Sequence, residues 1–77
     1  QMALSTAIMH VPVKIQLNGK MKETPAATVE ALLMESKLLP AQVAVEHNGT
    51  VLFRHELAQT HLREGDCIEI VRVVAGG

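Results

Sequence analysis

The last two residues of the chain, Gly76 and Gly77, are its strongest candidates for chemistry. A C-terminal carboxylate occurs once per chain, and glycine, which has no Cβ, lets the backbone enter a cleft that a side chain would block. Once adenylated by ATP, such a carboxylate becomes an acyl phosphate anhydride. A sulfur nucleophile can attack that anhydride with AMP as the leaving group, which gives a C-terminal thiocarboxylate. A frayed terminus would also end in small residues, so the glycines alone leave both interpretations open.

We predict that Ala75 and Gly76 form a flexible tail that delivers Gly77, because none of them offers a side chain that can pack. Four residues just before this tail form a candidate docking surface for an enzyme that acts on it: Val71, Arg72, Val73 and Val74. Strict alternation with Ile68 and Ile70 would expose some of these valines beside the tail. The arginine fits either a salt bridge to an acidic partner or a solvated position on the strand.

The remaining reactive side chains do not form a recognisable site. Cys67 is the only cysteine, no histidine stands at motif spacing from it, and we expect it to be a small buried hydrophobe. The four histidines show no H-E-x-x-H pattern, and one cysteine cannot complete a usual zinc set. We therefore expect that the protein binds no metal and no cofactor. We also expect it to be a carrier on which other enzymes act, and not an enzyme itself.

The amino-acid composition of the chain limits the classes of partner that it can bind. Seven Lys and Arg nearly cancel eight Asp and Glu, so a phosphate backbone would be attracted only weakly, and nucleic acid is excluded as a partner. The only aromatic residue, Phe53, is expected in an otherwise aliphatic core. No apolar run approaches the roughly 20 residues that span a bilayer, so we expect no membrane contact. A single cysteine fits the reducing cytoplasm, and we expect a monomer when the protein is free.

A clear residue pattern predicts the first strand and the turn that follows it. Apolar and polar residues alternate over 13–17, and Asn18-Gly19 follows at once, which predicts an antiparallel hairpin. A two-residue turn would set Lys20 opposite Leu17 on the buried face. We expect the register with a three-residue turn instead, because it sets Met21 there and leaves the lysine in water.

A single helix is expected from about 29 to 37, with Thr28 as its N-cap and Leu39-Pro40 as its stop. Asn48-Gly49 predicts the turn of a second hairpin. The other elements are expected as strands at 43–45, 51–53 and 67–74, with an irregular or briefly helical crossover at 54–62 that Leu57 and Leu62 attach to the core.

This order predicts one α+β domain, with a helix packed across a mixed sheet of four to five strands. With the first and last strands as central parallel neighbours, it is the order of the ubiquitin-like β-grasp fold. We expect residues 1–8 to be an expression remnant or a disordered N-terminus, residues 9–74 to form the domain, and residues 75–77 to form the tail.

Over residues 13–77 the chain resembles the ThiS family, the sulfur carriers of thiamine biosynthesis. The resemblance rests on these segments: Val13-Lys14-Ile15-Gln16-Leu17-Asn18-Gly19, Thr28-Val29-Glu30-Ala31-Leu32-Leu33, Val45-Glu46-His47-Asn48-Gly49, Arg54, Gly65-Asp66 and Val73-Val74-Ala75-Gly76-Gly77. It implies that an ATP-dependent adenylating enzyme related to the ubiquitin-activating enzyme modifies Gly77. A sulfur donor such as a cysteine desulfurase would then supply the sulfur, and thiazole synthase would receive it.

Other functions fit the same pattern. The small subunit of molybdopterin synthase shares the fold and the Gly-Gly end but often has a proline before the glycines, which Val73-Val74-Ala75 lacks. A sulfur carrier for another thiolation pathway also remains possible. From a different class, the chain could be a ubiquitin-like modifier of lysines or an interaction module.

Overall fold

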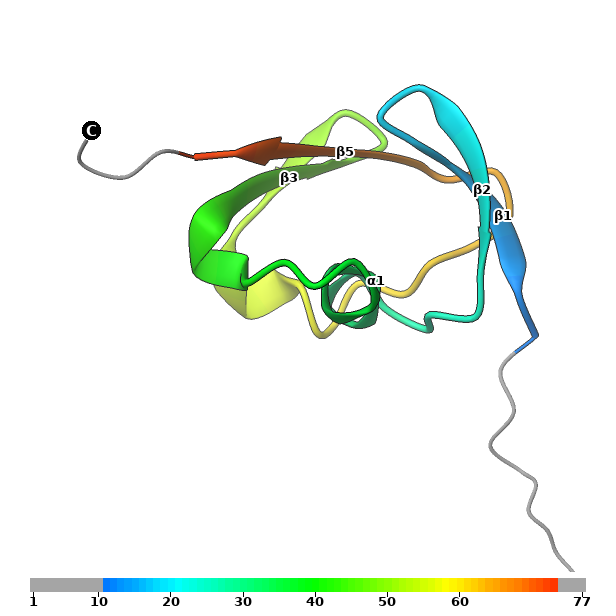
Figure 1. The fold of residues 1–77 in the computed structure, drawn as a ribbon, viewed down its shortest axis with the longest axis horizontal. Helices are drawn as coiled ribbons and strands as arrows, with labels where there is room; N and C mark the ends of the chain where they lie inside the picture. The colour runs from blue at the N-terminus through cyan, green and yellow to red at the C-terminus, as the bar shows by residue number, and fades with distance from the viewer. Residues whose placement is uncertain (1–10, 74–77) are drawn as a thin grey trace, which may run out of the picture.

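The computed structural model describes residues 11–73 (Figure 1). Its elements follow one another as β1 (Val13–Leu17), β2 (Lys20–Thr24), α1 (Val29–Glu35), the 3-10 turn η2 (Pro40–Gln42), β3 (Val43–His47), β4 (Thr50–Leu52), the 3-10 turn η3 (Arg54–Glu56) and β5 (Cys67–Arg72). The expected order of elements is therefore confirmed. The predicted strand over 67–74 ends two residues earlier, at Arg72.

The strands form one five-stranded sheet in the order β2-β1-β5-β3-β4. β1 and β5 run parallel, and all other neighbours run antiparallel. Figure 1 shows α1 on one side of this sheet, with the C-terminal strand β5 running through its middle. This is the predicted α+β, ubiquitin-like β-grasp arrangement, and it places the last strand at the centre of the sheet.

The first hairpin has a two-residue turn, so the register predicted for it is wrong. Leu17 pairs with Lys20, and Asn18 and Gly19 both have positive φ, 51° and 82°. Two successive left-handed residues match the twist of the flanking strands, which favours the shorter turn. The lysine is tolerated opposite Leu17 because β2 is an edge strand and the lysine side chain is exposed.

Helix α1 starts as expected and ends earlier than expected. The hydroxyl of Thr28 accepts a hydrogen bond from the backbone N–H of Ala31, which confirms the predicted N-cap. The helix ends at Glu35 because Lys37 adopts a left-handed conformation, φ 61°, and the N–H of Leu38 donates to the carbonyl of Leu33. The stop therefore lies before Pro40 and does not depend on it.

The core is aliphatic and lies between α1 and the sheet. Its buried members are Ile15, Val29, Leu32, Leu33, Val45, Leu57, Leu62 and Ile68. The prediction that Phe53 belongs to this core is wrong, because its side chain is 65% exposed. Leu52 already occupies the inward position at the end of β4, so alternation turns the next residue out, where its ring stacks on that of His55.

The crossover between β4 and β5 is briefly helical, which is one of the two predicted forms. It includes η3, and backbone hydrogen bonds tie it to the start of α1: Val29 N–H donates to the carbonyl of Thr60, and Leu62 N–H donates to that of Ala27. Leu57 and Leu62 are buried, as expected. These bonds hold the crossover beneath the sheet and fix the point from which β5 departs.

Candidate functional site

The candidate site lies where the chain leaves β5. The N–H of Val73 donates to the carbonyl of Gln42 at 2.8 Å, which extends the sheet ladder one residue beyond the strand. The predicted tail, Ala75 to Gly77, lies outside the described residues. Three residues separate Val73 from Gly77, so chain length alone limits the distance between the Cα atoms of these two residues to about 14 Å.

Both Asn-Gly turns hold β5 with their asparagine side chains. Oδ1 of Asn18 accepts from the N–H of Ile70 at 2.8 Å, and Oδ1 of Asn48 accepts from the N–H of Cys67 at 2.8 Å. The sequence predicted these asparagines as turn residues only. Their second role depends on the tertiary arrangement, which brings both turns to β5 and fixes its register.

Asp66 anchors the start of β5. Its side chain is 9% exposed, and its carboxylate accepts from Asn48 Nδ2 at 3.1 Å, from the N–H of Arg63 at 2.9 Å and from His47 Nε2 at 3.0 Å. An ionised carboxylate only accepts, so His47 must carry its hydrogen on Nε2. Burial raises the pKa of Asp66, but the hydrogen bonds from Asn48, Arg63 and His47 together outweigh it and lower that pKa below its ordinary value of 3.8.

This lowered pKa makes the fold sensitive to acid. Because the pKa of Asp66 is lower in the folded than in the unfolded chain, its stabilising effect is complete above 3.8 and is lost as pH falls through the folded-state value. We expect the free energy of unfolding to be smaller at acid pH than at neutral pH, with a flatter profile in Asp66→Asn. Urea titrations from neutral to acid pH measure both profiles. A variant as acid-sensitive as the parent would show that other carboxylates govern the effect.

The structure separates the residues of the predicted docking surface. Val71 and Val73 are 61% and 50% exposed, which confirms that strand alternation turns them outward. Arg72 is also exposed, but alternation directs it to the opposite side, the side of α1. Val74 lies outside the described residues. Exposure of the valines is thus established, and docking through them stays a prediction.

The prediction that Cys67 is buried is wrong. Its side chain is exposed, with Sγ 4.0 Å from Oε1 of Gln16. Ile68 occupies the inward position on β5 and is completely buried, so the residue before it must face out. Exposure makes the thiol accessible, but no basic side chain forms a hydrogen bond or ion pair with it among residues 11–73.

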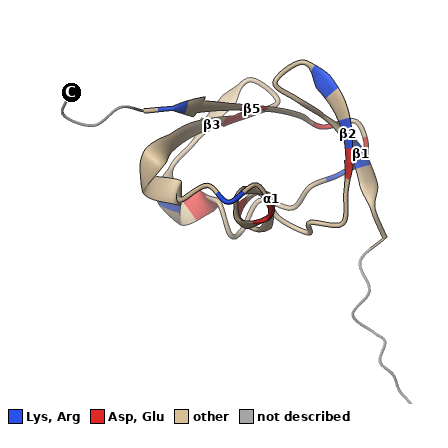
Figure 2. Ribbon diagram, in the orientation of Figure 1, with Lys and Arg blue, Asp and Glu red and all other residues tan. Residues whose placement is uncertain are grey.

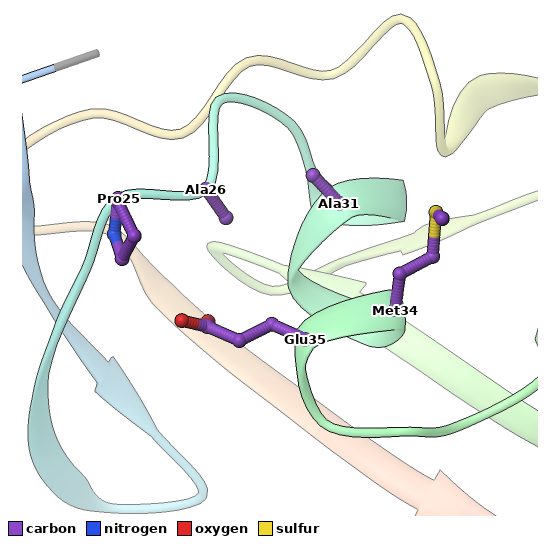
Figure 3. Close-up of a pocket in the computed structure, with 5 residues that line it drawn as sticks. All are labelled: Pro25, Ala26, Ala31, Met34 and Glu35. Carbon is purple, nitrogen blue, oxygen red and sulfur yellow. The ribbon is translucent and has the colours of Figure 1, made fainter. Parts of the chain in front are cut away.

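A shallow pocket lies between the β2–α1 loop and the helix (Figure 3). Its volume is about 400 Å³, and it is lined by Pro25, Ala26, Ala31, Met34 and Glu35. The carboxylate in this lining is already engaged, since Oε1 of Glu35 accepts from the hydroxyl of Thr24 at 2.6 Å. None of the lining residues belongs to β5. Within residues 11–73, no three His, Cys, Asp or Glu side chains converge as metal ligands, and no helix could cross a membrane.

Three comparisons show which known proteins this chain is similar to. The model of the ThiS family matches residues 15–77. A crystal structure of the thiamine biosynthesis protein ThiS from Geobacter metallireducens superposes with a TM-score of 0.70 at 33% identity, covering 84% of this chain and all of that one. A thiazole synthase from Paramagnetospirillum magneticum is 38% identical over 65 residues, which cover 83% of this chain. The chain spans about a fifth, 20%, of the length of that relative.

Proposed function

The chain belongs to the ThiS family, the sulfur carriers of thiamine biosynthesis, and we propose that it carries sulfur on the carboxylate of Gly77. The observation that supports this most is the position of β5. It is the central strand, held by both Asn-Gly turns and by Asp66, and it is the last strand of the chain before Gly77. A strand held at several points and followed in the sequence by a glycine pair suits a group that must enter another protein's active site.

The proposed chemistry uses only the C-terminus of this chain. The Gly77 carboxylate attacks the α-phosphate of ATP, and pyrophosphate leaves. A persulfide on the sulfur donor then attacks the acyl carbon of the resulting adenylate, and AMP leaves with the bonding electrons. A second thiol attacks the donor's sulfur in the acyl disulfide that forms, so the thiocarboxylate leaves and the two thiols are left joined as a disulfide. The adenylating enzyme provides the ATP site, and a donor such as a cysteine desulfurase provides the sulfur, so this chain needs no bound cofactor.

Thiazole synthase is the proposed acceptor of that sulfur. The relative from Paramagnetospirillum magneticum bears that name, and a fifth of its length aligns with most of this chain. A carrier segment within the same chain as its acceptor would raise the effective concentration of one for the other. The family match also favours the thiamine carrier over the molybdopterin synthase subunit, the lysine modifier and the simple interaction module.

The proposal is tested by the intact mass of the protein after co-expression with the adenylating enzyme and a sulfur donor. We expect one oxygen to be replaced by sulfur, and fragmentation to locate the change at Gly77. The matched control is Cys67→Ser, which removes the exposed thiol and should leave the mass change intact. A sulfur that is lost in this variant, or that fragmentation places at residue 67, would refute Gly77 as the carrier group.

A further inference from the structure

The face of the sheet opposite α1 carries two carboxylates side by side. Glu46 on β3 pairs directly with Glu69 on β5, and both side chains are exposed. Figure 2 colours the Asp and Glu positions red along the ribbon. Neither makes a salt bridge or a side-chain hydrogen bond among residues 11–73, where the one salt bridge joins His47 to Asp66. Like charges directly opposite each other destabilise a sheet. Folding alone therefore gives no reason for this pair.

Exposed apolar side chains frame the two carboxylates. Val51 on β4 pairs with Glu46 and is 56% exposed. Val71 on β5 pairs with Ala44 on β3, and this pair lies two residues along the strands from Glu46 and Glu69. Phe53 follows Val51 by two residues, so alternation places it on the same side. These residues form one surface, which we call the open-face patch: Ala44, Glu46, Val51, Phe53, Glu69 and Val71.

We propose that the open-face patch is the docking surface for the enzyme that adenylates Gly77, and that Glu46 and Glu69 together bind an arginine or lysine side chain of that enzyme. This inference rests on the proposed function. Two adjacent carboxylates can accept several N–H donors from one guanidinium, and an apolar rim that excludes water strengthens such a contact. The partner surface should therefore present a basic side chain surrounded by apolar ones.

Within residues 11–73, the strands around this pair offer no cation to neutralise it. Arg72 is the only Lys or Arg in β3, β4 and β5, and alternation places it on the side of α1. On the open face of the neighbouring strands, Lys14 is already opposite Glu23. The negative charge of Glu46 and Glu69 is therefore available to a basic side chain of a partner. Binding of that side chain would reduce the repulsion between the two carboxylates.

The patch also lies within reach of the working group. Glu69 and Val71 belong to the strand from which the tail departs, and an extended chain from Glu69 to Gly77 spans at most about 28 Å. An enzyme that holds the Gly77 carboxylate in its ATP site must therefore lie close to the end of β5, and contact with the open-face patch would orient the tail.

A second copy of the chain fits the patch poorly. A symmetric dimer through this face would bring the four carboxylates of two copies together, because such an interface uses the same surface twice. The repulsion within each pair would then increase rather than fall. The complementary surface must come from a different, basic protein.

The test is the double variant Glu46→Gln/Glu69→Gln, assayed by ATP–pyrophosphate exchange with the purified adenylating enzyme at increasing carrier concentration. We expect the KM for the carrier to rise about tenfold or more, with kcat near that of the parent, because docking is weakened and the tail is unchanged. Added salt should raise the KM of the parent but have little effect on the variant. The variant should fold at least as stably as the parent, since a repulsion is removed.

The matched control is Glu23→Gln, which removes an exposed carboxylate from the same face but from the edge strand β2. Its KM should match that of the parent. An unchanged KM in the double variant, or an equal rise in the control, would overturn the proposal. A parent dimer in sedimentation that the double substitution alters would also overturn it, in favour of a second copy as the occupant.

The outcome also separates this inference from the proposed function. If the parent chain is not adenylated at all, the proposed function fails, and docking is then read from calorimetric titration of the chain into the same enzyme. Binding that weakens about tenfold in the double variant but not in Glu23→Gln would still support the open-face patch. No binding by the parent would refute it.

Discussion

Deletion of Gly77 is expected to abolish adenylation while the domain stays folded. The shortened chain ends at Gly76, about 3.5 Å short of the place where the enzyme expects the carboxylate. Misplacing a reacting atom by 1 Å can cost on the order of a hundredfold in rate, so pyrophosphate exchange should fall to background. The fold should persist, because the sheet ladder described here ends at Val73.

The deleted chain has a second expected property that makes the result specific. Its open-face patch is intact, so it should still compete with the parent chain for the adenylating enzyme. Gly76→Val should also block activation, because a β-branched side chain stiffens the tail and obstructs a narrow cleft. Activation of the deleted chain at the normal rate would mean that the C-terminal carboxylate is not the working group.

Local sequence signals predicted most of the fold. Each Asn-Gly pair forms a turn with positive φ, and Thr28 caps the helix, because these features depend on neighbouring residues alone. Alternation in β5 correctly turned Ile68 inward and Val71 outward. The parallel pairing of β1 with β5 followed from the order of elements rather than from any local signal.

The wrong predictions concern residues whose place depends on what lies across the sheet. Lys20 is tolerated opposite Leu17 because β2 is an edge strand, which the local pattern does not reveal. Phe53 was assigned to the core as the only aromatic residue of the chain, yet the inward position at the end of β4 belongs to Leu52. Cys67 was assigned to the core by its residue type, although its alternation with Ile68 already directed it outward.

The residues of the candidate site also fall into those that the sequence predicts and those that only the structure brings together. Gly77 was predicted from its position at the end of the given sequence, which requires no structure, and it stays a prediction. Glu46 and Glu69 had no signal in the sequence, because their proximity depends on the pairing of β3 with β5. A docking surface assembled from three strands is therefore visible only once the order and register of the sheet are known.

Ile68→Ala is expected to have the largest effect on stability, and Val71→Ala on the same strand is its matched control. Ile68 is completely buried between α1 and the sheet, so its truncation should lower the free energy of unfolding by about 2–5 kcal/mol. Val71 is 61% exposed, so its truncation should change stability by no more than about 0.5 kcal/mol. Urea denaturation followed by far-UV circular dichroism measures both.

The effects of the two variants on docking to the adenylating enzyme should be the reverse of their effects on stability. Val71→Ala removes part of the open-face patch and should raise the KM for the carrier, whereas chains of a folded Ile68 variant should dock as the parent does. If Ile68→Ala leaves too little folded protein, Ile68→Val, with an expected loss of about 0.5–1.5 kcal/mol, keeps the comparison measurable. Equal losses of stability at positions 68 and 71 would show that the inward and outward faces of β5 are assigned wrongly. The open-face patch would then lose its basis, because Val71 and Glu69 share the outward face.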